Sequence, residues 1–208
     1  MIAIIDYGMG NLASVKKALI YLHAEAEITD SYDQIMAADG VILPGVGAIA
    51  PAMEALKAKG LDKAVYDTVA SGKPLLGICL GMQLLLDASE EGAKAGSMIP
   101  ALGVIPGKVV KFPDDKTVDL GMKVPQMGWN NLVDVKGSLL RENDYVYFVH
   151  SYYCAPDNKE DVAAYAQYGI KYAAALEHGN VFATQFHPEK SGEVGLQILN
   201  SFIRRVRK

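Results

Sequence analysis

Apolar residues in the first half of the chain fall into two alternating patterns. Residues 2–5, 41–43 and 74–78 are short runs that are mostly or entirely aliphatic, which is typical of strands buried on both faces. Between and after these runs, apolar residues recur every three or four positions, as on one face of a helix. We expect helices over residues 12–22, 48–59, 61–70 and 80–86. This alternation predicts a parallel sheet covered by helices.

The second half of the chain has a different pattern, because short strand-like segments follow one another with polar turns between them. These segments are residues 109–112, 145–150, 162–166, 173–176 and 181–185. Residues 177–180, Glu-His-Gly-Asn, separate the last two and predict a hairpin. A final helix is expected over residues 192–205. Residues 1–208 are therefore predicted to form one α/β domain: a mixed, mostly parallel central sheet flanked by helices, with antiparallel strands in the C-terminal half.

The composition fits an ordinary globular domain and limits which partners and which cellular compartment are expected. Half of the 208 residues are hydrophobic and the formal net charge is only -4, with no basic cluster, which argues against nucleic acid as a partner. The apolar start is interrupted at Asp6, too early for a signal peptide or a membrane span. Two cysteines, Cys79 and Cys154, are too few for a disulfide framework. We expect a cytoplasmic protein that binds no membrane, no metal and no cofactor.

Cys79 occupies the most informative position in the sequence, within Gly77-Ile78-Cys79-Leu80-Gly81. This pentapeptide joins an expected buried strand to an expected helix and has a small residue on each side of a nucleophile, the pattern of a nucleophile elbow. In such a turn the glycines allow close backbone approach, and the start of the helix favours thiolate over thiol. The N–H of Leu80 would face the oxyanion formed when the sulfur attacks a carbonyl. The alternative is a buried core cysteine, which has no use for paired glycines.

Gln185-Phe186-His187-Pro188-Glu189 offers the base that a thiol nucleophile needs. His187 and Glu189 stand two positions apart at the end of an expected strand, so both side chains can point to one site. Pro188 favours an extended conformation at His187, in keeping with that geometry. Glu189 would hold the tautomer and orientation of the imidazole. The alternative is an exposed histidine beside a solvated glutamate, and the conjunction with the Cys79 turn weighs against it.

Taken together, these motifs resemble the class I, triad-type glutamine amidotransferases. Residues 73–83 are similar to the nucleophile segment of that family, residues 185–189 to its histidine–glutamate segment, and residues 43–47 to its oxyanion strand. Their order and wide spacing agree as well, so the resemblance covers essentially the whole chain. It implies a glutaminase with Cys79, His187 and Glu189 as catalytic residues, in which a glutamyl thioester forms on the sulfur and is hydrolysed.

The resemblance also implies roles for residues around the triad. Backbone N–H groups of Gly47 and Leu80 would form the oxyanion hole. We also predict that the glycines of residues 45–47 allow this turn to keep the second oxyanion donor turned away until the partner is occupied. Gln83 and the backbone around Ser151 and Tyr152 would hold the amino-acid end of glutamine. Without the resemblance, Gln83 reads equally well as a polar residue on a half-exposed helix.

Further motifs are similar to one branch of the family. They are residues 6–12 (DYGMGNL), 124–130 (VPQMGWN), 148–152 (FVHSY) and 187–192 (HPEKSG). In that branch the glutaminase forms a heterodimer with a cyclase subunit of (β/α)8-barrel type and supplies it with ammonia. The resemblance implies that Asn11, Tyr147 and Lys190 lie at or near this interface. Gln126 departs from the branch, which more often has histidine there.

Other functions remain open at this point. Free ammonia is quickly protonated and stops being a nucleophile, so a glutaminase of this kind needs a docked acceptor enzyme. That acceptor could instead make pyridoxal phosphate, anthranilate or guanylate. A stand-alone cysteine hydrolase of small amides or γ-glutamyl peptides would be fully active alone and would expose no apolar docking surface. A regulatory subunit with an inactive glutaminase fold is disfavoured, because all three triad residues are present.

Overall fold

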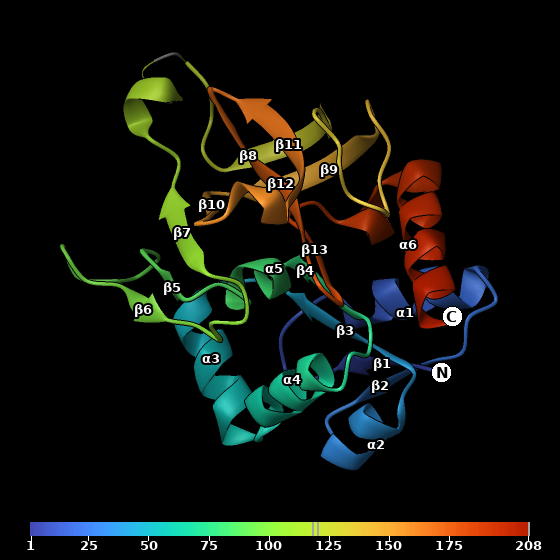
Figure 1. The fold of residues 1–208 in the computed structure, drawn as a ribbon. Helices are drawn as coiled ribbons and strands as arrows, with labels where there is room; N and C mark the ends of the chain where they lie inside the picture. Colours follow the sequence, from blue (N-terminus) through green and yellow to red (C-terminus); the bar gives the residue numbers. More distant parts are fainter. Residues whose placement is uncertain (118, 120, 208) are drawn as a thin grey trace.

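A long mixed sheet organises residues 1–117, 119 and 121–207, which the computed structural model describes (Figure 1). Its strands are β1 (Ile2–Ile5), β2 (Ala26–Thr29), β3 (Gly40–Gly45), β4 (Leu75–Cys79), β5 (Ala88–Ser89), β6 (Ile99–Pro100), β7 (Gly107–Lys111), β10 (Tyr152–Pro156), β11 (Val162–Tyr168), β12 (Ile170–His178) and β13 (Val181–Thr184). They lie in the order β2-β1-β3-β4-β13-β12-β10-β7-β5-β6, and β11 pairs with β12. Neighbours from β2 to β13 are parallel, whereas those from β13 to β7 are antiparallel.

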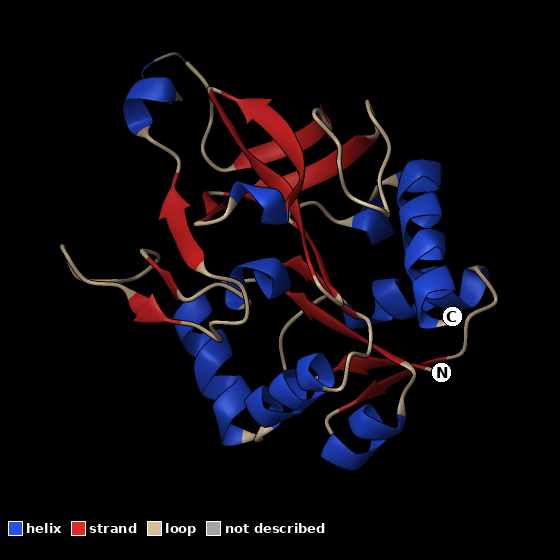
Figure 2. Ribbon diagram, viewed as in Figure 1, coloured by secondary structure: helices blue, strands red, loops and turns tan. Residues whose placement is uncertain are grey.

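Helices cover both faces of the parallel part of the sheet (Figures 1 and 2). They are α1 (Leu12–Tyr21), α2 (Tyr32–Ala37), α3 (Ile49–Ala58), α4 (Leu61–Ala70), α5 (Leu80–Leu84) and α6 (Gly192–Val206), with 3-10 turns η1 (Asp114–Lys116), η3 (Lys159–Asp161) and η4 (Pro188–Lys190). Alternate residues of β1 face opposite layers. Ile2 and Ile4 pack with residues of α1 and α6, while Ala3 and Ile5 pack with residues of α2, α3 and α4. This double burial explains why the strand is apolar throughout.

A separate two-stranded sheet is formed by β8 (Gln126–Asn131) and β9 (Tyr145–His150). The strands are antiparallel, and Gln126 lies opposite His150. The inner face of this sheet buries Gln126, Phe148 and His150. From β9 the chain continues through Ser151 directly into β10 of the large sheet. The small sheet is thereby held beside the carboxyl end of the parallel strands.

The predicted fold class is confirmed, and the expected long elements are present. The apolar runs form β1, β3 and β4, the helical periods form α1, α3, α4, α5 and α6, and β12 and β13 form the expected hairpin. The pattern missed β2, α2, β5, β6, β8 and β10. The first four are short, and β8 and β10 have few fully buried positions, so none carries a clear hydrophobic period.

No helix in the described part of the chain has both the length and the apolar character that crossing a membrane would require.

The order of three neighbouring strands determines where the sequence motifs meet. β3, β4 and β13 lie side by side and run parallel, so their carboxyl ends share one edge of the sheet. Gly45 pairs with Cys79 across β3 and β4, and Thr184 pairs with Ile78 across β13 and β4. The turn after β3, the corner after β4 and the segment after β13 therefore converge, as ligand-binding residues do in open α/β sheets.

Candidate active site

Cys79 stands at a sharp corner where β4 ends and α5 begins at the next residue. Its backbone has φ 55° and ψ -108°, a left-handed conformation that costs energy for any residue with a Cβ. The flanking glycines are sterically required. A Cβ on Gly81 would overlap the carbonyl oxygen of Leu43, and one on Gly77 would lie 2.9 Å from the carbonyl oxygen of Gly81. The corner thus holds the sulfur at the start of a helix, where its backbone dipoles favour negative charge.

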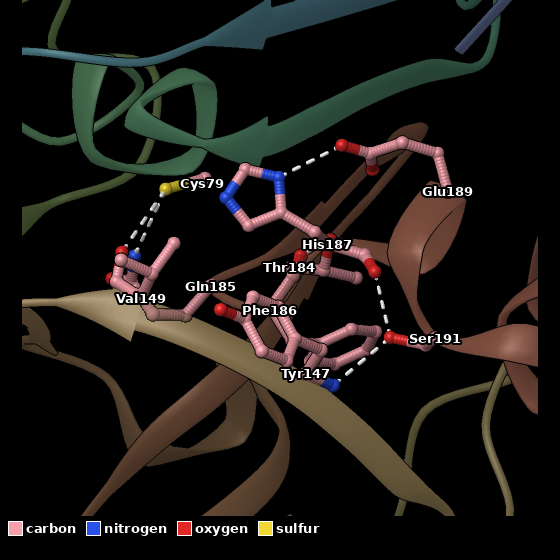
Figure 3. Close-up of polar contacts among 9 residues, drawn as sticks. All are labelled: Cys79, Tyr147, Val149, Thr184, Gln185, Phe186, His187, Glu189 and Ser191. Atoms are coloured by element: carbon pink, nitrogen blue, oxygen red, sulfur yellow. Dashed lines mark hydrogen bonds and ion pairs between the residues drawn. The ribbon is translucent and has the colours of Figure 1, made fainter. Parts of the chain in front are cut away.

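His187 and Glu189 form a buried pair that faces this sulfur (Figure 3). His187 Nδ1 lies 2.9 Å from Glu189 Oε1, and because a carboxylate only accepts, Nδ1 carries the hydrogen. Nε2 is the ring nitrogen directed at Cys79 in Figure 3, and it has no hydrogen-bond partner among the described residues. The unprotonated nitrogen of the neutral ring therefore faces the thiol. This is the tautomer that a base for Cys79 needs.

The protonated form of His187 is stabilised in this site. Burial by itself would lower the pKa of His187, but the Cys79 sulfur and the Glu189 carboxylate outweigh burial and raise the pKa to about 9. An imidazolium beside a thiolate is therefore a favourable charge arrangement here. The geometry suits proton transfer from Cys79 to His187.

Ser191 fixes the segment that carries His187, and the sequence motifs gave it no role. Its hydroxyl donates to the carbonyl of His187 at 2.6 Å and accepts from the N–H of Tyr147 at 3.0 Å (Figure 3). The N–H of His187 also donates to the carbonyl of Tyr147 at 3.0 Å. The backbone of His187 is thus tied to Tyr147 of β9 twice, directly through its N–H and through Ser191 at its carbonyl. In the sequence, only the position of Ser191 within the motif of residues 187–192 could have indicated this role.

A pocket of about 270 Å³ opens in front of Cys79 and His187. It contains most of the residues that the sequence proposed for the site. Its lining consists of Val46, Gly47, Cys79, Leu80, Gln83, Glu91, Pro125, Val149, His150, Ser151, Tyr152 and His187. Glu189 is not part of this lining, because it lies behind His187. The pocket has the size of a small amino-acid substrate and brings a nucleophile, a base and polar groups together.

Glu91 is a pocket residue that sequence reasoning missed. Its Oε2 accepts a hydrogen bond of 3.2 Å from the N–H of Ile49, the first residue of α3. Burial raises the pKa of this carboxyl, although the hydrogen bond from Ile49 opposes the shift. In the sequence Glu91 is one of two adjacent acids in a polar loop, and nothing there distinguishes it from a solvated residue.

The turn after β3 forms another wall of the pocket, with Val46 and Gly47 exposed in it. Gly47 has φ 99°, which a residue with a Cβ rarely adopts. The hydroxyl of the buried Tyr7 donates to the carbonyl of Pro44 at 2.9 Å and anchors the start of the turn. Leu80, across the pocket, is the first residue of α5, so its N–H is free of intrahelical bonds.

Asn11, Tyr147 and Lys190, the residues expected at a partner interface, all retain some exposure. Asn11 precedes α1, Lys190 follows Glu189 in η4, and Tyr147 packs edge-on against Trp129 on the outer face of the small sheet. Gln126 is buried on the inner face, where its Oε1 accepts from the hydroxyl of Tyr172 at 2.8 Å. Its position is therefore structural rather than part of the pocket lining.

Within the described residues, no group of three or more His, Cys, Asp or Glu side chains is arranged to hold a metal ion.

Comparison with known proteins decides the family. The model of the family "Glutamine amidotransferase class-I" matches residues 3–206. The chain belongs to this family. The resemblance drawn from the motifs is thereby confirmed.

Curated relatives of this amidotransferase include proteins named imidazole glycerol phosphate synthase subunit HisH. Imidazole glycerol phosphate synthase subunit HisH of Chlorobaculum tepidum is 49% identical over 208 residues, covering 97% of this chain and 98% of the relative. The protein of the same name from Methanothermobacter thermautotrophicus is 46% identical and both chains are covered completely. These proteins form the branch that the motifs around Tyr7, Trp129 and Ser151 resemble.

Solved structures share the fold of the amidotransferase at low identity. A crystal structure of a glutamine amidotransferase superposes with a TM-score of 0.73 at 20% identity, covering 99% of each chain. The structure of PurLQS from Thermotoga maritima gives a TM-score of 0.71 at 16% identity, covering 98% of this chain and 97% of that one.

Proposed function

We propose that this amidotransferase is the glutaminase subunit of an imidazole glycerol phosphate synthase, with Cys79, His187 and Glu189 as its catalytic residues. One observation carries the catalytic assignment. The sulfur of Cys79 sits on a strained corner in front of a free imidazole nitrogen, and the other nitrogen of that ring is held by a buried carboxylate. Relatives that are 45–49% identical over nearly the full chain support the assignment to this synthase.

The first half of the reaction releases ammonia. His187 Nε2 takes the proton of the Cys79 thiol, and the thiolate attacks the side-chain amide carbon of glutamine. The imidazolium, stabilised by Glu189, then gives its proton to the departing nitrogen as the carbon–nitrogen bond breaks. Ammonia leaves, and a glutamyl thioester remains on Cys79.

The second half of the reaction regenerates the enzyme. His187 takes a proton from water, whose oxygen attacks the thioester carbon and displaces the sulfur of Cys79. Glutamate leaves, its new γ-carboxyl group releasing its proton to solvent, and the thiolate and imidazolium are ready to attack the next glutamine. Backbone N–H groups of Leu80 and Gly47 hold the oxyanion in both halves.

Contacts in the pocket suit the amino-acid end of glutamine. Gln83 donates both amide hydrogens to protein acceptors, which leaves its Oε1 to accept from a substrate ammonium group. Glu91 supplies a carboxylate in the same pocket and pairs with that ammonium group. Ser151 and Tyr152 line the same pocket, and their backbone receives the substrate carboxylate.

An exposed aromatic surface next to the pocket supports a docked partner. Met127, Trp129 and Tyr145 are 65%, 46% and 51% exposed on the outer face of β8 and β9, and Trp129 stacks on Tyr145. Such a surface is typical of a protein interface and does not fit a stand-alone hydrolase. In this proposal the partner is a cyclase subunit of (β/α)8-barrel type that forms a heterodimer with this chain in the cytoplasm. Asn11, Tyr147 and Lys190 lie at the interface, and glutamine is the substrate.

The test is synthesis by the complex of this chain with the cyclase subunit, with either glutamine or ammonium as nitrogen source. We expect Cys79→Ala to abolish glutamine hydrolysis and glutamine-dependent synthesis, and to leave ammonia-dependent synthesis unchanged. Glutamine hydrolysis at the wild-type rate by Cys79→Ala would contradict the assignment. A different synthase co-purifying with the chain would contradict the proposed acceptor.

A further inference from the structure

Gln185 is fully buried, and its side-chain amide lies between the sulfur of Cys79 and the side-chain amide of Gln83. Its Nε2 lies 3.8 Å from the sulfur of Cys79, within the range of an N–H···S hydrogen bond (Figure 3). Its Oε1 accepts from Gln83 Nε2 at 3.1 Å. The backbone N–H of Gln185 donates to the carbonyl of Ala174 at 2.8 Å, so the residue is fixed at the end of β13.

The direction of these hydrogen bonds follows from one backbone carbonyl. Gln83 Nε2 also lies 3.1 Å from the carbonyl oxygen of Tyr152, which can only accept. Gln83 must therefore present its NH2 group, and its second hydrogen goes to Gln185. Gln185 must then present oxygen to Gln83, which leaves its own NH2 group directed at Cys79. His150 Nδ1 lies 2.8 Å from the same carbonyl and holds it in place.

We propose that Gln185 is a further catalytic residue, whose amide N–H stabilises the thiolate of Cys79. The inference rests on the proposed role of Cys79 as nucleophile. An amide is neutral and stays protonated, so it stabilises negative charge on sulfur without competing with His187 for the proton. The thiol form has a different contact, because Cys79 Sγ lies 3.9 Å from the carbonyl oxygen of Val149. The thiol favours the carbonyl of Val149, which accepts its hydrogen, whereas the thiolate favours the amide of Gln185, which donates one.

Other groups also act on the charge of this sulfur and remain constant in the test. His187 faces it directly, the hydroxyl of Tyr7 and the thiol of Cys154 interact with it electrostatically, and Glu91 lines the same pocket. The variant must therefore leave these groups in place. Gln185→Met does so, since methionine has nearly the volume of glutamine and no N–H donor.

The experiment measures the pH dependence of Cys79 alkylation by iodoacetamide in the complex with the cyclase subunit, with the modified peptide identified by mass spectrometry. We expect Gln185→Met to raise the pKa of the Cys79 thiol by about one unit and to lower kcat for glutamine about tenfold. Because the change also removes the acceptor of one Gln83 hydrogen, KM for glutamine should rise as well, and the thiol pKa is the decisive value. Gln197→Met, an exposed change on α6, is the matched control and should alter none of these values. An unchanged thiol pKa in Gln185→Met would overturn the inference.

A second measurement uses the wild-type protein, with Cys79→Ala as the control, and does not depend on the folding of a Gln185 variant. The nitrogen-15 resonance of the Gln185 side-chain amide should shift with pH in step with the ionisation of Cys79, and the shift should vanish in Cys79→Ala. A nitrogen-15 chemical shift of Gln185 that does not change as Cys79 ionises also overturns the inference. If one of these results overturns the role of Gln185 while wild-type glutaminase activity still requires Cys79, the proposed function stands. Failure of the inference can therefore be told apart from failure of the proposed function.

Discussion

His150 and His187 line the same pocket, yet their surroundings move their pKa values in opposite directions. His187 has a carboxylate and a sulfur beside it, which overcome the effect of burial. His150 is enclosed by Phe112, Phe148 and Tyr172, and its Nε2 lacks a hydrogen-bond partner in the described part of the chain. Burial lowers the pKa of His150 to about 4, although its bond to the carbonyl of Tyr152 opposes the shift. One imidazole is thus prepared to take a proton and the other to remain neutral.

The low pKa of His150 predicts a loss of stability in acid. Below the ordinary value of 6.5 the unfolded chain takes up a proton at His150, whereas the folded chain does so only near 4. Stability is therefore lost as the pH falls from about 6.5 to about 4, by up to about 3 kcal/mol from this residue. The raised pKa of His187 adds nothing in this window, because its contribution is complete below about 6.5 and is lost only as the pH rises through about 9.

Urea unfolding at about pH 7 and about pH 4.5 measures this effect. We expect His150→Gln to reduce the difference in unfolding free energy between the two conditions. His23→Gln, which changes an exposed histidine, should leave the difference as in the wild type. Equal acid sensitivity of His150→Gln and the wild type would contradict the account of His150.

At the scale of elements, the corner between β4 and α5 depends on Gly81. A Cβ on Gly81 would overlap the carbonyl of Leu43 in β3, and both segments are buried, so neither can move away cheaply. We expect Gly81→Ala to lower the free energy of unfolding by more than about 3 kcal/mol and to abolish glutaminase activity. Gly72→Ala is the control. Gly72 has φ 77° and open space around it, so the change should cost only about 1–2 kcal/mol.

Urea unfolding of both variants, with far-ultraviolet circular dichroism of the folded forms, provides the comparison. Equal stability of Gly81→Ala and Gly72→Ala would show that the close approach of β3 and α5 is not what requires glycine at this corner.

The elements that the sequence predicted best are those that build this corner. β3, β4 and β13 are buried on both faces, so their apolar runs stand out. Cys79 is the last residue of β4, and His187 lies in the segment after β13. β8 exposes Met127 and Trp129, and its polar inner residue Gln126 breaks the hydrophobic pattern. Local pattern cannot detect such a strand, because its partner β9 determines which face is buried.

Local sequence pattern is limited in the same way for single residues of the site. Cys79, His187 and Glu189 lie in short motifs whose spacing already indicates their chemistry. Glu91 and Gln185 acquire their roles only from partners far away in the chain, Ile49 for one and Cys79 for the other. Their hydrogen bonds exist only once the fold has formed, so no local pattern indicates the role of Glu91, and only the place of Gln185 in the motif of residues 185–189 could have pointed to that residue.

At the scale of the whole molecule, the pocket lies beside the surface proposed for the partner. Val149 contributes to the pocket, and Trp129 and Tyr147 occupy the outer face of the same small sheet. A partner docked there would also approach the exposed turn at Val46 and Gly47. Tyr7 anchors the start of that turn. In the proposed mechanism the glycine peptides beyond it rotate and present or withdraw the oxyanion donor.

This arrangement predicts that the partner controls the glutaminase. We expect glutamate release by the isolated chain to be at least about tenfold slower than by the complex with the cyclase subunit and its nucleotide ligand, because loss of one oxyanion donor costs at least that much. A coupled glutamate dehydrogenase assay measures both rates. Equal rates with and without the partner would contradict the proposed rotation of the turn.

The covalent intermediate on Cys79 is the most direct test of the account. The complex turning over glutamine is quenched in acid and digested, and the peptides that contain Cys79 and Cys154 are weighed by mass spectrometry. We predict a γ-glutamyl group on Cys79 and none on Cys154, and no γ-glutamyl adduct on the remaining Cys154 of the Cys79→Ala variant. Glutamate formation at the wild-type rate with no adduct on Cys79, or an adduct on Cys154 instead, would contradict the account.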